Sequence, residues 1–245
     1  MKIGLIGDIH ANLPALVAVN DHLQRWKIEQ IWNIGDFVGY GPYPNQAIDF
    51  CRRMQYVSVS GNYDHKVLHF EEKERKWARK KIPEKMVSFR WAAEQLSPEN
   101  RAYLAELPDQ REFLIEGWRI LLIHSSPADP KEHLCPATPL ARLEEISRQY
   151  PYDLIICGHS HEPFIRKAGK TWFINTGSVG RPDDGDPRAT YAYLELRPGA
   201  LWACHLRVAY PVSETVAEIR RQELPEDYAQ MLLHGRNLES ILAEK

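Results

Sequence analysis

The 245-residue chain lacks the features that define several other classes of protein. It has four scattered cysteines and no CxxC spacing, a usage that fits reduced, mostly buried thiols. No apolar run approaches the roughly 20 residues that a membrane span needs. The first residues, MKIGLIGDIH, have neither the basic segment nor the small-residue cleavage site of a secretion signal. We therefore expect a cytoplasmic protein without a membrane partner.

The chain also has no marked excess of positive or negative residues. The formal net charge is −2, which gives no sign of a general nucleic-acid or membrane surface. This value does not exclude a local basic groove. The composition, 44% hydrophobic and 26% charged, is that of an ordinary globular protein. Because the sequence has no internal repeat, low-complexity tract or coiled-coil seam, it leaves the oligomeric state open.

Polar residues that can bind metals follow a series of short apolar segments. These segments are residues 2–7, 30–34, 56–59, 119–123 and 154–157, and they are predicted to be buried strands. The polar clusters that follow them are Asp8-Ile9-His10, Gly35-Asp36, Gly61-Asn62-Tyr63-Asp64, His124 and Gly158-His159-Ser160-His161. Strands that end in this way predict an α/β sheet with a site along one edge.

The donor atoms in these clusters suit divalent metals. Two aspartates, one asparagine and four histidines are enough to hold two divalent ions that share one carboxylate. Two metals about 3.5–4 Å apart form a clamp for in-line attack on phosphorus. The pattern therefore predicts hydrolysis of a phosphate ester.

We expect a single domain over residues 1–245, because ligands spread from residue 8 to residue 161 must converge. Asn12 is expected to cap a helix that has Pro14 in its first turn. Residues from about 65 to 107 carry mixed charge runs and predict a helical cap inserted beside the site. A solvated helical face explains these charges, and direct gripping of phosphate or nucleic acid by the lysines is the alternative. Further helices are expected at about 213–245.

This series of motifs resembles the calcineurin-like metallophosphoesterase superfamily. The segments 35–42 (GDFVGYGP) and 175–180 (NTGSVG) are similar to its small prokaryotic phosphodiesterase branch. The resemblance spans nearly the whole chain. It implies a four-layer α-β-β-α sandwich with two mixed sheets face to face and helices outside.

The resemblance also implies roles for the ligands. One metal is expected on Asp8, His10 and His161, a second on Asn62, His124 and His159, and Asp36 is expected to bridge both. A hydroxide between the ions would attack phosphorus. Manganese is the metal we expect. Iron, zinc, nickel and magnesium stay open because mixed nitrogen and oxygen ligands exclude none of them.

The chain departs from the family pattern at Tyr63, where many related phosphatases have a histidine that assists the leaving group. A phenol is a poorer proton donor than imidazole near neutral pH, so Tyr63 favours substrates whose leaving group needs little help. His65 is an alternative acid, against an exposed or capping role. Asp64 is placed with the catalytic residues and is expected to orient a neighbouring group. His133 is a candidate substrate contact.

The leading hypothesis is a dinuclear phosphoesterase that acts on phosphodiester or nucleotide substrates, with Asp36, Asn62, Tyr63 and Asp64 as the catalytic set and Asn62, Tyr63 and His133 contacting the substrate. The alternatives are a phosphomonoesterase, including a protein phosphatase, and a catalytically weak scaffold, as in the retromer subunit that resembles this family. The natural substrate is left open. Arg181 lies in a loop with Asp183, where both substrate contact and a salt bridge within the loop are open.

Overall fold

The computed structural model describes residues 1–245 and contains two five-stranded sheets. The first sheet has the strand order β10-β9-β1-β2-β3 and consists of β1 (Lys2–Ile6), β2 (Gln30–Asn33), β3 (Val57–Ser58), β9 (Ala189–Arg197) and β10 (Ala200–Val208). The second has the order β4-β5-β6-β8-β7 and consists of β4 (Gln110–Ile115), β5 (Trp118–Ile123), β6 (Leu154–Cys157), β7 (Phe164–Ala168) and β8 (Thr171–Asn175). Both sheets are mixed. In the first, β1, β2 and β3 are parallel and β9 and β10 are antiparallel at one edge. In the second, the parallel strands β5, β6 and β8 have an antiparallel strand at each edge.

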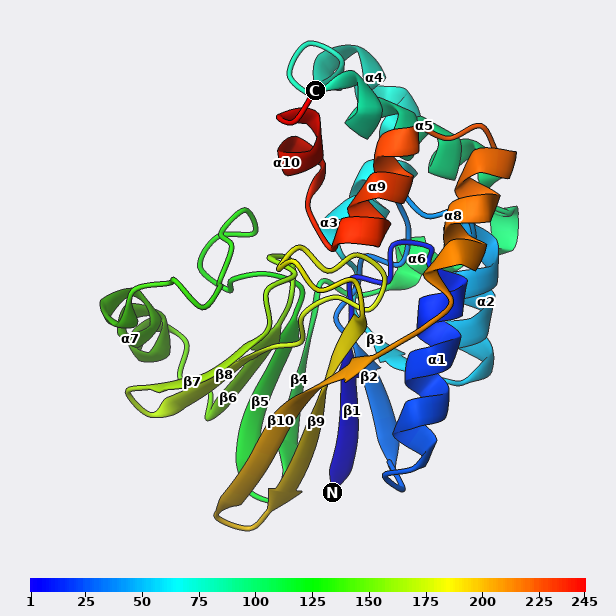
Figure 1. Ribbon diagram of the computed structural model, residues 1–245. Helices are drawn as coiled ribbons and strands as arrows, with labels where there is room; N and C mark the ends of the chain where they lie inside the picture. Colours follow the sequence, from blue (N-terminus) through cyan, green and yellow to red (C-terminus); the bar gives the residue numbers. More distant parts are fainter.

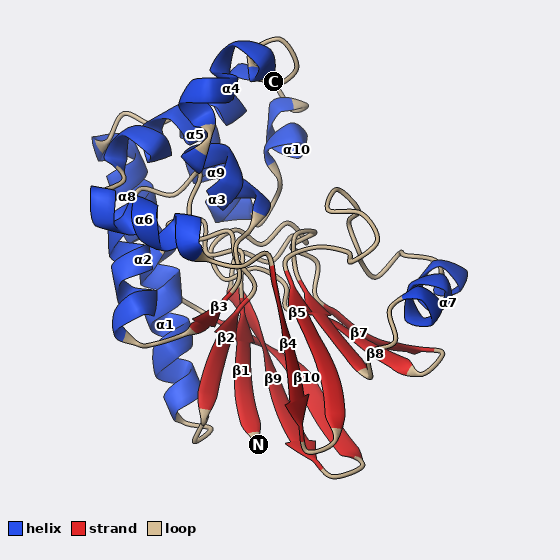
Figure 2. Ribbon diagram, turned by 180° about the vertical axis from the view of Figure 1, so that it is seen from behind, coloured by secondary structure: helices blue, strands red, loops and turns tan.

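Three apolar clusters separate four layers. The cluster between the sheets contains side chains from both of them, such as Leu5, Trp32 and Ile156. A larger cluster joins the first sheet to helices that include α1 (Leu13–Gln24) and α2 (Pro44–Arg53), and a smaller one joins the second sheet to α7 (Leu140–Gln149). Figures 1 and 2 show α7 alone outside one sheet and the other helices on the opposite side. The expected α-β-β-α sandwich is confirmed.

The remaining helices lie toward one end of the sheets (Figure 1). The cap consists of α3 (Asn62–Leu68), α4 (Phe70–Trp77), α5 (Pro83–Gln95) and α6 (Pro98–Glu106). The C-terminal helices are α8 (Val212–Arg221), α9 (Glu226–His234) and α10 (Leu238–Leu242). The two groups touch, because the Tyr228 hydroxyl of α9 donates to the Glu84 carbonyl of α5, and Lys85 of α5 pairs with Glu239 of α10.

Local sequence explains how α1 begins. The Asn12 side chain accepts a hydrogen bond from the Ala15 amide at 3.4 Å, and Pro14 lies in the first turn, so the predicted cap is confirmed. None of the helices combines the length and apolar character that a membrane crossing requires. The loop that precedes α1 holds the first of the expected metal ligands, so this cap also fixes the chain at the edge of the site.

Candidate metal centre

The loops that carry the expected ligands have strained backbones. Five of these residues have positive φ, between 46° and 68°, and they are Asp8, His10, Asp36, His159 and His161. Non-glycine residues seldom adopt this conformation, and it costs on the order of 1–3 kcal/mol each, so it persists where the surrounding structure enforces it. The chain bends sharply at each strand end, and these bends bring the ligands of different strands together.

Two glycines allow the loops to approach closely. A Cβ on Gly61 would lie 2.2 Å from the Asp36 amide nitrogen, and one on Gly158 would lie 2.4 Å from Asp8 Oδ2. No side chain fits at either position without moving the neighbouring ligand. The glycines in the motifs Gly61-Asn62 and Gly158-His159 therefore serve the packing of one ligand loop against the next.

One group of ligand atoms is fully buried. Asp8, His10, Asp36 and His161 each offer one atom, and these atoms all lie within 4.8 Å of one another. His161 Nε2 is 3.2 Å from His10 Nε2 and 3.2 Å from Asp8 Oδ1. We call Asp8, His10 and His161 the inner group, because none of them is more than 2% exposed.

A second group faces the other side of Asp36. His124 Nε2 lies 3.0 Å from Asn62 Oδ1 and 3.2 Å from His159 Nδ1, and Asn62 Oδ1 lies 3.2 Å from His159 Nδ1. We call Asn62, His124 and His159 the outer group. Asp36 Oδ2 is 3.7 Å from His10 Nε2 of the inner group and 3.6 Å from His124 Nε2 of the outer group.

The donor atoms fit a bound cation. Asp8 Oδ1 is buried and has no hydrogen-bond partner. The Asn62 side-chain amide lies against three acceptor atoms, His159 Nδ1, His124 Nε2 and Asp36 Oδ2. Lone pairs gathered in this way repel one another, and a divalent cation removes that repulsion. The residues of both groups are therefore of the kind and in the place to hold metal.

Backbone carbonyls orient three of the histidines. His10 Nδ1 lies 3.2 Å from the Val38 carbonyl, His124 Nδ1 lies 2.9 Å from the Ile34 carbonyl, and His161 Nδ1 lies 2.7 Å from the Arg181 carbonyl. A carbonyl accepts only from a protonated ring nitrogen, so in the neutral form of each ring Nε2 carries the lone pair and faces the centre. His159 differs, since its Nδ1 faces the other ligands.

Burial shapes the titration of these groups. Desolvation lowers the pKa of His10 and of His159, which keeps both imidazoles neutral, the form that binds metal. Burial raises the pKa of Asp36. For His161, burial and Arg181 lower the pKa, but Asp8 and Asp183 outweigh them and raise it to about 9. A cation at His161 would therefore displace a proton.

The two groups open into a cleft of about 470 Å³. Of the predicted site residues, Asp36, Asn62, Tyr63, His133, His159 and His161 line it. The His133 ring lies 4.2 Å from the His159 ring, centroid to centroid, which places it beside the outer group. The cleft gives a substrate access to the outer group, while Asp8 and His10 lie behind it.

Tyr63 and Asp64 have different environments. The Tyr63 hydroxyl lies 2.6 Å from the Tyr40 hydroxyl, and burial raises the pKa of Tyr63. Asp64 is fully buried and accepts hydrogen bonds from the amides of Gly61, Phe37 and Val38. Asp64 thus ties the Asp36 loop to the Asn62 loop and does not line the cleft.

His65 also lies outside the cleft lining. Its Nε2 is 2.8 Å from Asp109 Oδ1 and 2.9 Å from Ser60 Oγ, and half of its side chain is exposed. These contacts match the exposed role that the sequence offered for it. Substrate contact and a salt bridge within its loop were the two roles considered for Arg181. Arg181 lines the cleft and also pairs with Asp183 at 2.9 Å.

Sequence reasoning missed several residues of the cleft wall. Lys66 and Lys85 of the cap line it, as do Asn237 and Glu239 at the start of α10. Lys66 follows Asn62 by one helical turn, so that spacing could have identified it. Asn237 and Glu239 carry no such signal, because they reach the site only through the folding of the C-terminal helices over the cap.

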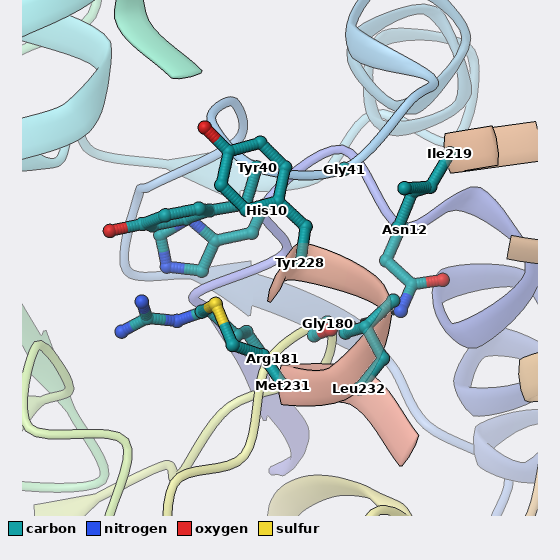
Figure 3. A pocket seen from close by; sticks show the side chains of 10 residues that line it. All are labelled: His10, Asn12, Tyr40, Gly41, Gly180, Arg181, Ile219, Tyr228, Met231 and Leu232. Atoms are coloured by element: carbon teal, nitrogen blue, oxygen red, sulfur yellow. Dashed lines mark hydrogen bonds between the residues drawn. The ribbon is translucent and has the colours of Figure 1, made fainter. Parts of the chain in front are cut away.

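The C-terminal helices also seal the back of the inner group. Ile219 of α8 and Tyr228, Met231 and Leu232 of α9 line a small pocket together with His10, Tyr40 and Arg181, and Figure 3 shows Ile219 at the Asn12 side of it. The cavity left among these side chains measures about 10 Å³, room for a single water molecule. The Arg181 guanidinium lies over the Tyr40 ring at 4.7 Å. Water therefore has little access to His10 from this side.

Comparison with known proteins agrees with this geometry. The family model of the calcineurin-like phosphoesterase superfamily domain matches residues 1–199. An uncharacterized protein of Methanocaldococcus jannaschii is 31% identical over 254 aligned positions, which cover 96% of this chain and 98% of that protein. The phosphodiesterase YfcE of Escherichia coli K12 is 23% identical over 209 positions, covering 80% of this chain and 88% of that protein.

Solved structures extend the likeness to the fold. A metallophosphoesterase from Sphaerobacter thermophilus is 29% identical with a TM-score of 0.78, and the match covers 96% of this chain and 99% of the other. A hypothetical protein from Pyrococcus horikoshii OT3 shares the fold with a TM-score of 0.86 at 23% identity, over 96% of this chain and 98% of the other. The chain belongs to the calcineurin-like phosphoesterase superfamily, a family of metal-dependent phosphate-ester hydrolases.

Proposed function

We propose that this protein holds two divalent metal ions and hydrolyses phosphodiester or nucleotide substrates. One observation carries the proposal: a single carboxylate oxygen, Asp36 Oδ2, lies within 3.7 Å of a histidine nitrogen from the inner group and 3.6 Å of one from the outer group. A shared carboxylate between two ligand sets is the arrangement that a pair of neighbouring metals requires.

In this proposal Asp8, His10 and His161 hold one ion, Asn62, His124 and His159 hold the other, and Asp36 bridges them. When bound, the two ions supply a nucleophile from water at neutral pH and neutralise charge on the phosphoryl oxygens. Manganese remains the metal we expect, and the mixed nitrogen and oxygen donors also accept iron, zinc, nickel or magnesium.

The chain's own residues prepare the substrate. His133 and Tyr63 line the cleft beside the outer group, where they contact the phosphate ester. Asp64 fixes the positions of Asp36 and Asn62 through three backbone amides. The Tyr63 hydroxyl is hydrogen-bonded to the Tyr40 hydroxyl. Tyr63 is a weak proton donor, because burial raises its pKa. Leaving groups that need no proton, such as those of activated diesters, therefore suit the site best.

The test is hydrolysis of bis(4-nitrophenyl) phosphate, a diester, and 4-nitrophenyl phosphate, its monoester, by manganese-loaded protein. We expect diester turnover to exceed monoester turnover. Asp36→Asn should reduce both by roughly a thousandfold or more, since it removes the shared charge. The metal content, measured by mass spectrometry, should be close to two ions per chain and should fall in Asp36→Asn.

Asp109→Asn is the matched control, because Asp109 is an exposed aspartate outside the centre and should leave both rates and metal content unchanged. Faster monoester turnover would keep the metal centre and overturn the diester preference. Bound metal without turnover of either ester would favour the scaffold hypothesis.

A further inference from the structure

Three lysines of the cap gather beside the outer group. Lys66 Nζ lies next to the Asn62 amide and 4.5 Å from the centre of the Tyr63 ring. Lys66 and Lys81 each place Nζ 5.7 Å from the centre of the same Phe89 ring. Lys85, one turn along α5, lines the cleft together with Lys66. Lys66 and Lys85 thus bring two positive charges to the cleft wall, and Lys81 adds a third against the same Phe89 ring as Lys66.

Two of these charges have no acidic partner. Lys85 pairs with Glu239, but neither Lys66 nor Lys81 forms an ion pair. Both are partly buried, and burial followed by repulsion from Lys85 lowers the pKa of Lys81. Partly buried like charges without partners destabilise the fold, and a bound anion would offset that cost.

The metal centre does not account for this cluster. The seven expected ligands and the ions that they would hold already supply the charge needed at the scissile phosphate. Lys81 lies in the segment between α4 and α5, beyond the residues that line the cleft. A second negative group, attached to the scissile phosphate and extending toward the cap, would come close to Lys66 and Lys85 on the cleft wall, with Lys81 behind them.

We propose that Lys66, Lys81 and Lys85 form an anion subsite, and that the substrate is an organic polyphosphate with a second phosphate next to the scissile one. This inference rests on the proposed phosphoesterase function and narrows its substrate class. Lysine suits the task because its ammonium is a compact charge that binds phosphate from several directions. The Tyr63 and Phe89 rings lie beside the ammonium groups of Lys66 and Lys81, which adds a cation–π attraction to the positions of these charges.

Two probes separate the subsite from the metal centre. Methylenebisphosphonate has two phosphorus groups joined by a carbon that cannot be hydrolysed, and methylphosphonate has one. Their affinities for the metal-free protein are measured by calorimetry. Their inhibition of diester hydrolysis by the manganese-loaded protein is measured at constant free manganese. We expect wild-type protein to prefer the bisphosphonate in both measurements.

Lys81→Met should reduce this preference about fivefold, the effect of losing one charge-assisted contact. Lys66→Met should reduce it at least as much. Lys80→Met is the matched control, because Lys80 is the exposed neighbour of Lys81, and it should keep the wild-type preference. Lys85→Met serves as a further variant if either of the others fails to fold.

The same preference in Lys81→Met and Lys80→Met would overturn the subsite. So would equal binding of the two probes to wild-type protein. If no variant or wild-type protein hydrolyses any ester, the proposed phosphoesterase function fails. The binding of the two probes to metal-free protein still decides the subsite in that case, so the two failures are distinguishable.

Discussion

The inner and outer groups consist of similar residues but differ in their burial. The inner residues Asp8, His10 and His161 are at most 2% exposed, and α8 and α9 close the space behind them. In the outer group, Asn62 and His159 are partly exposed and line the cleft. Both inner histidines, and His124 of the outer group, donate through Nδ1 to backbone carbonyls, whereas His159 turns Nδ1 toward the other ligands.

This difference indicates that the two groups have different functions. A buried, carbonyl-anchored set of ligands is preorganised and holds an ion tightly, because little side-chain freedom is lost on binding. A set at the floor of an open cleft can exchange water and admit substrate. We therefore expect the inner group to dominate metal retention and the outer group to dominate contact with the phosphate ester.

Removing one histidine from each group tests most directly whether the two groups differ in function. We expect His161→Ala to lower diester turnover by roughly a thousandfold and to lose the tighter of two bound metals. His159→Ala should lower turnover by roughly a hundredfold and retain that tighter metal. Metal content after dialysis against a chelator, together with diester kinetics, measures both. Equal metal loss in the two variants would contradict this difference in function.

Tyr63→His tests the chemistry on the open side of the centre. Imidazole is a better proton donor than a buried phenol near pH 7, so monoester turnover should rise about tenfold, below the full range for a well-placed general acid. Diester turnover should change little. The ratio of the two rates, measured for wild type and variant at the same free manganese, is the readout. Tyr63→Phe is the control and should leave the ratio low; an unchanged ratio in Tyr63→His would mean that Tyr63 does not limit monoester hydrolysis.

The comparison also shows where sequence reasoning succeeds. Each ligand follows a buried strand. β1 is parallel to β2 in the first sheet, so local pattern brings Asp8 and Asp36 together at one edge of it. β5 is parallel to β6 in the second sheet, so the same pattern brings His124 and His159 together. The fold followed from the same motifs through the family resemblance. Strand β7 and helix α7, which close the second sheet, lack a motif and were missed.

The cleft walls were harder to predict for a physical reason. Glu239 meets Lys85 across 154 residues of chain, and Tyr228 meets Glu84 across 144. Such contacts arise from the docking of helices and leave no local periodicity. Strand β3 is shorter than the sequence predicts. Only Val57 and Ser58 pair with β2, although the apolar pattern indicates a strand over residues 56–59.

Asp183→Asn probes the support of the inner group. Asp183 Oδ2 lies 2.9 Å from the Arg181 guanidinium and 3.1 Å from His161 Nδ1, so its charge holds both beside the centre. Removing that charge should weaken metal binding by the inner group about tenfold, as loss of an outer-shell partner does. Competition with a metal-sensitive dye measures the affinity. Asp184→Asn, in the same loop and paired with Arg207, is the control; a tenfold loss there too would point to the loop as a whole rather than to Asp183.

Glu239→Gln should have the smallest effect, because its ion pair with Lys85 joins the cap to α10 over the open side and its side chain is 60% exposed. Exposed pairs stabilise a protein by about 0–1 kcal/mol, so the thermal midpoint should fall by no more than about 4 °C. Removing a carboxylate from the cleft wall also frees Lys85 for anions. We therefore expect the KM for a diester to fall about twofold at low salt and the difference to vanish at high salt, where charges are screened.

Glu244→Gln is the matched control, since Glu244 is also 60% exposed and pairs with Arg236 away from the cleft lining. It should reproduce any small loss of stability without the change in KM. A KM that falls equally in both variants would show that the C-terminal helices act on the site through their packing. A change confined to Glu239→Gln would show that α10 tunes the charge of the cleft wall beside Lys85.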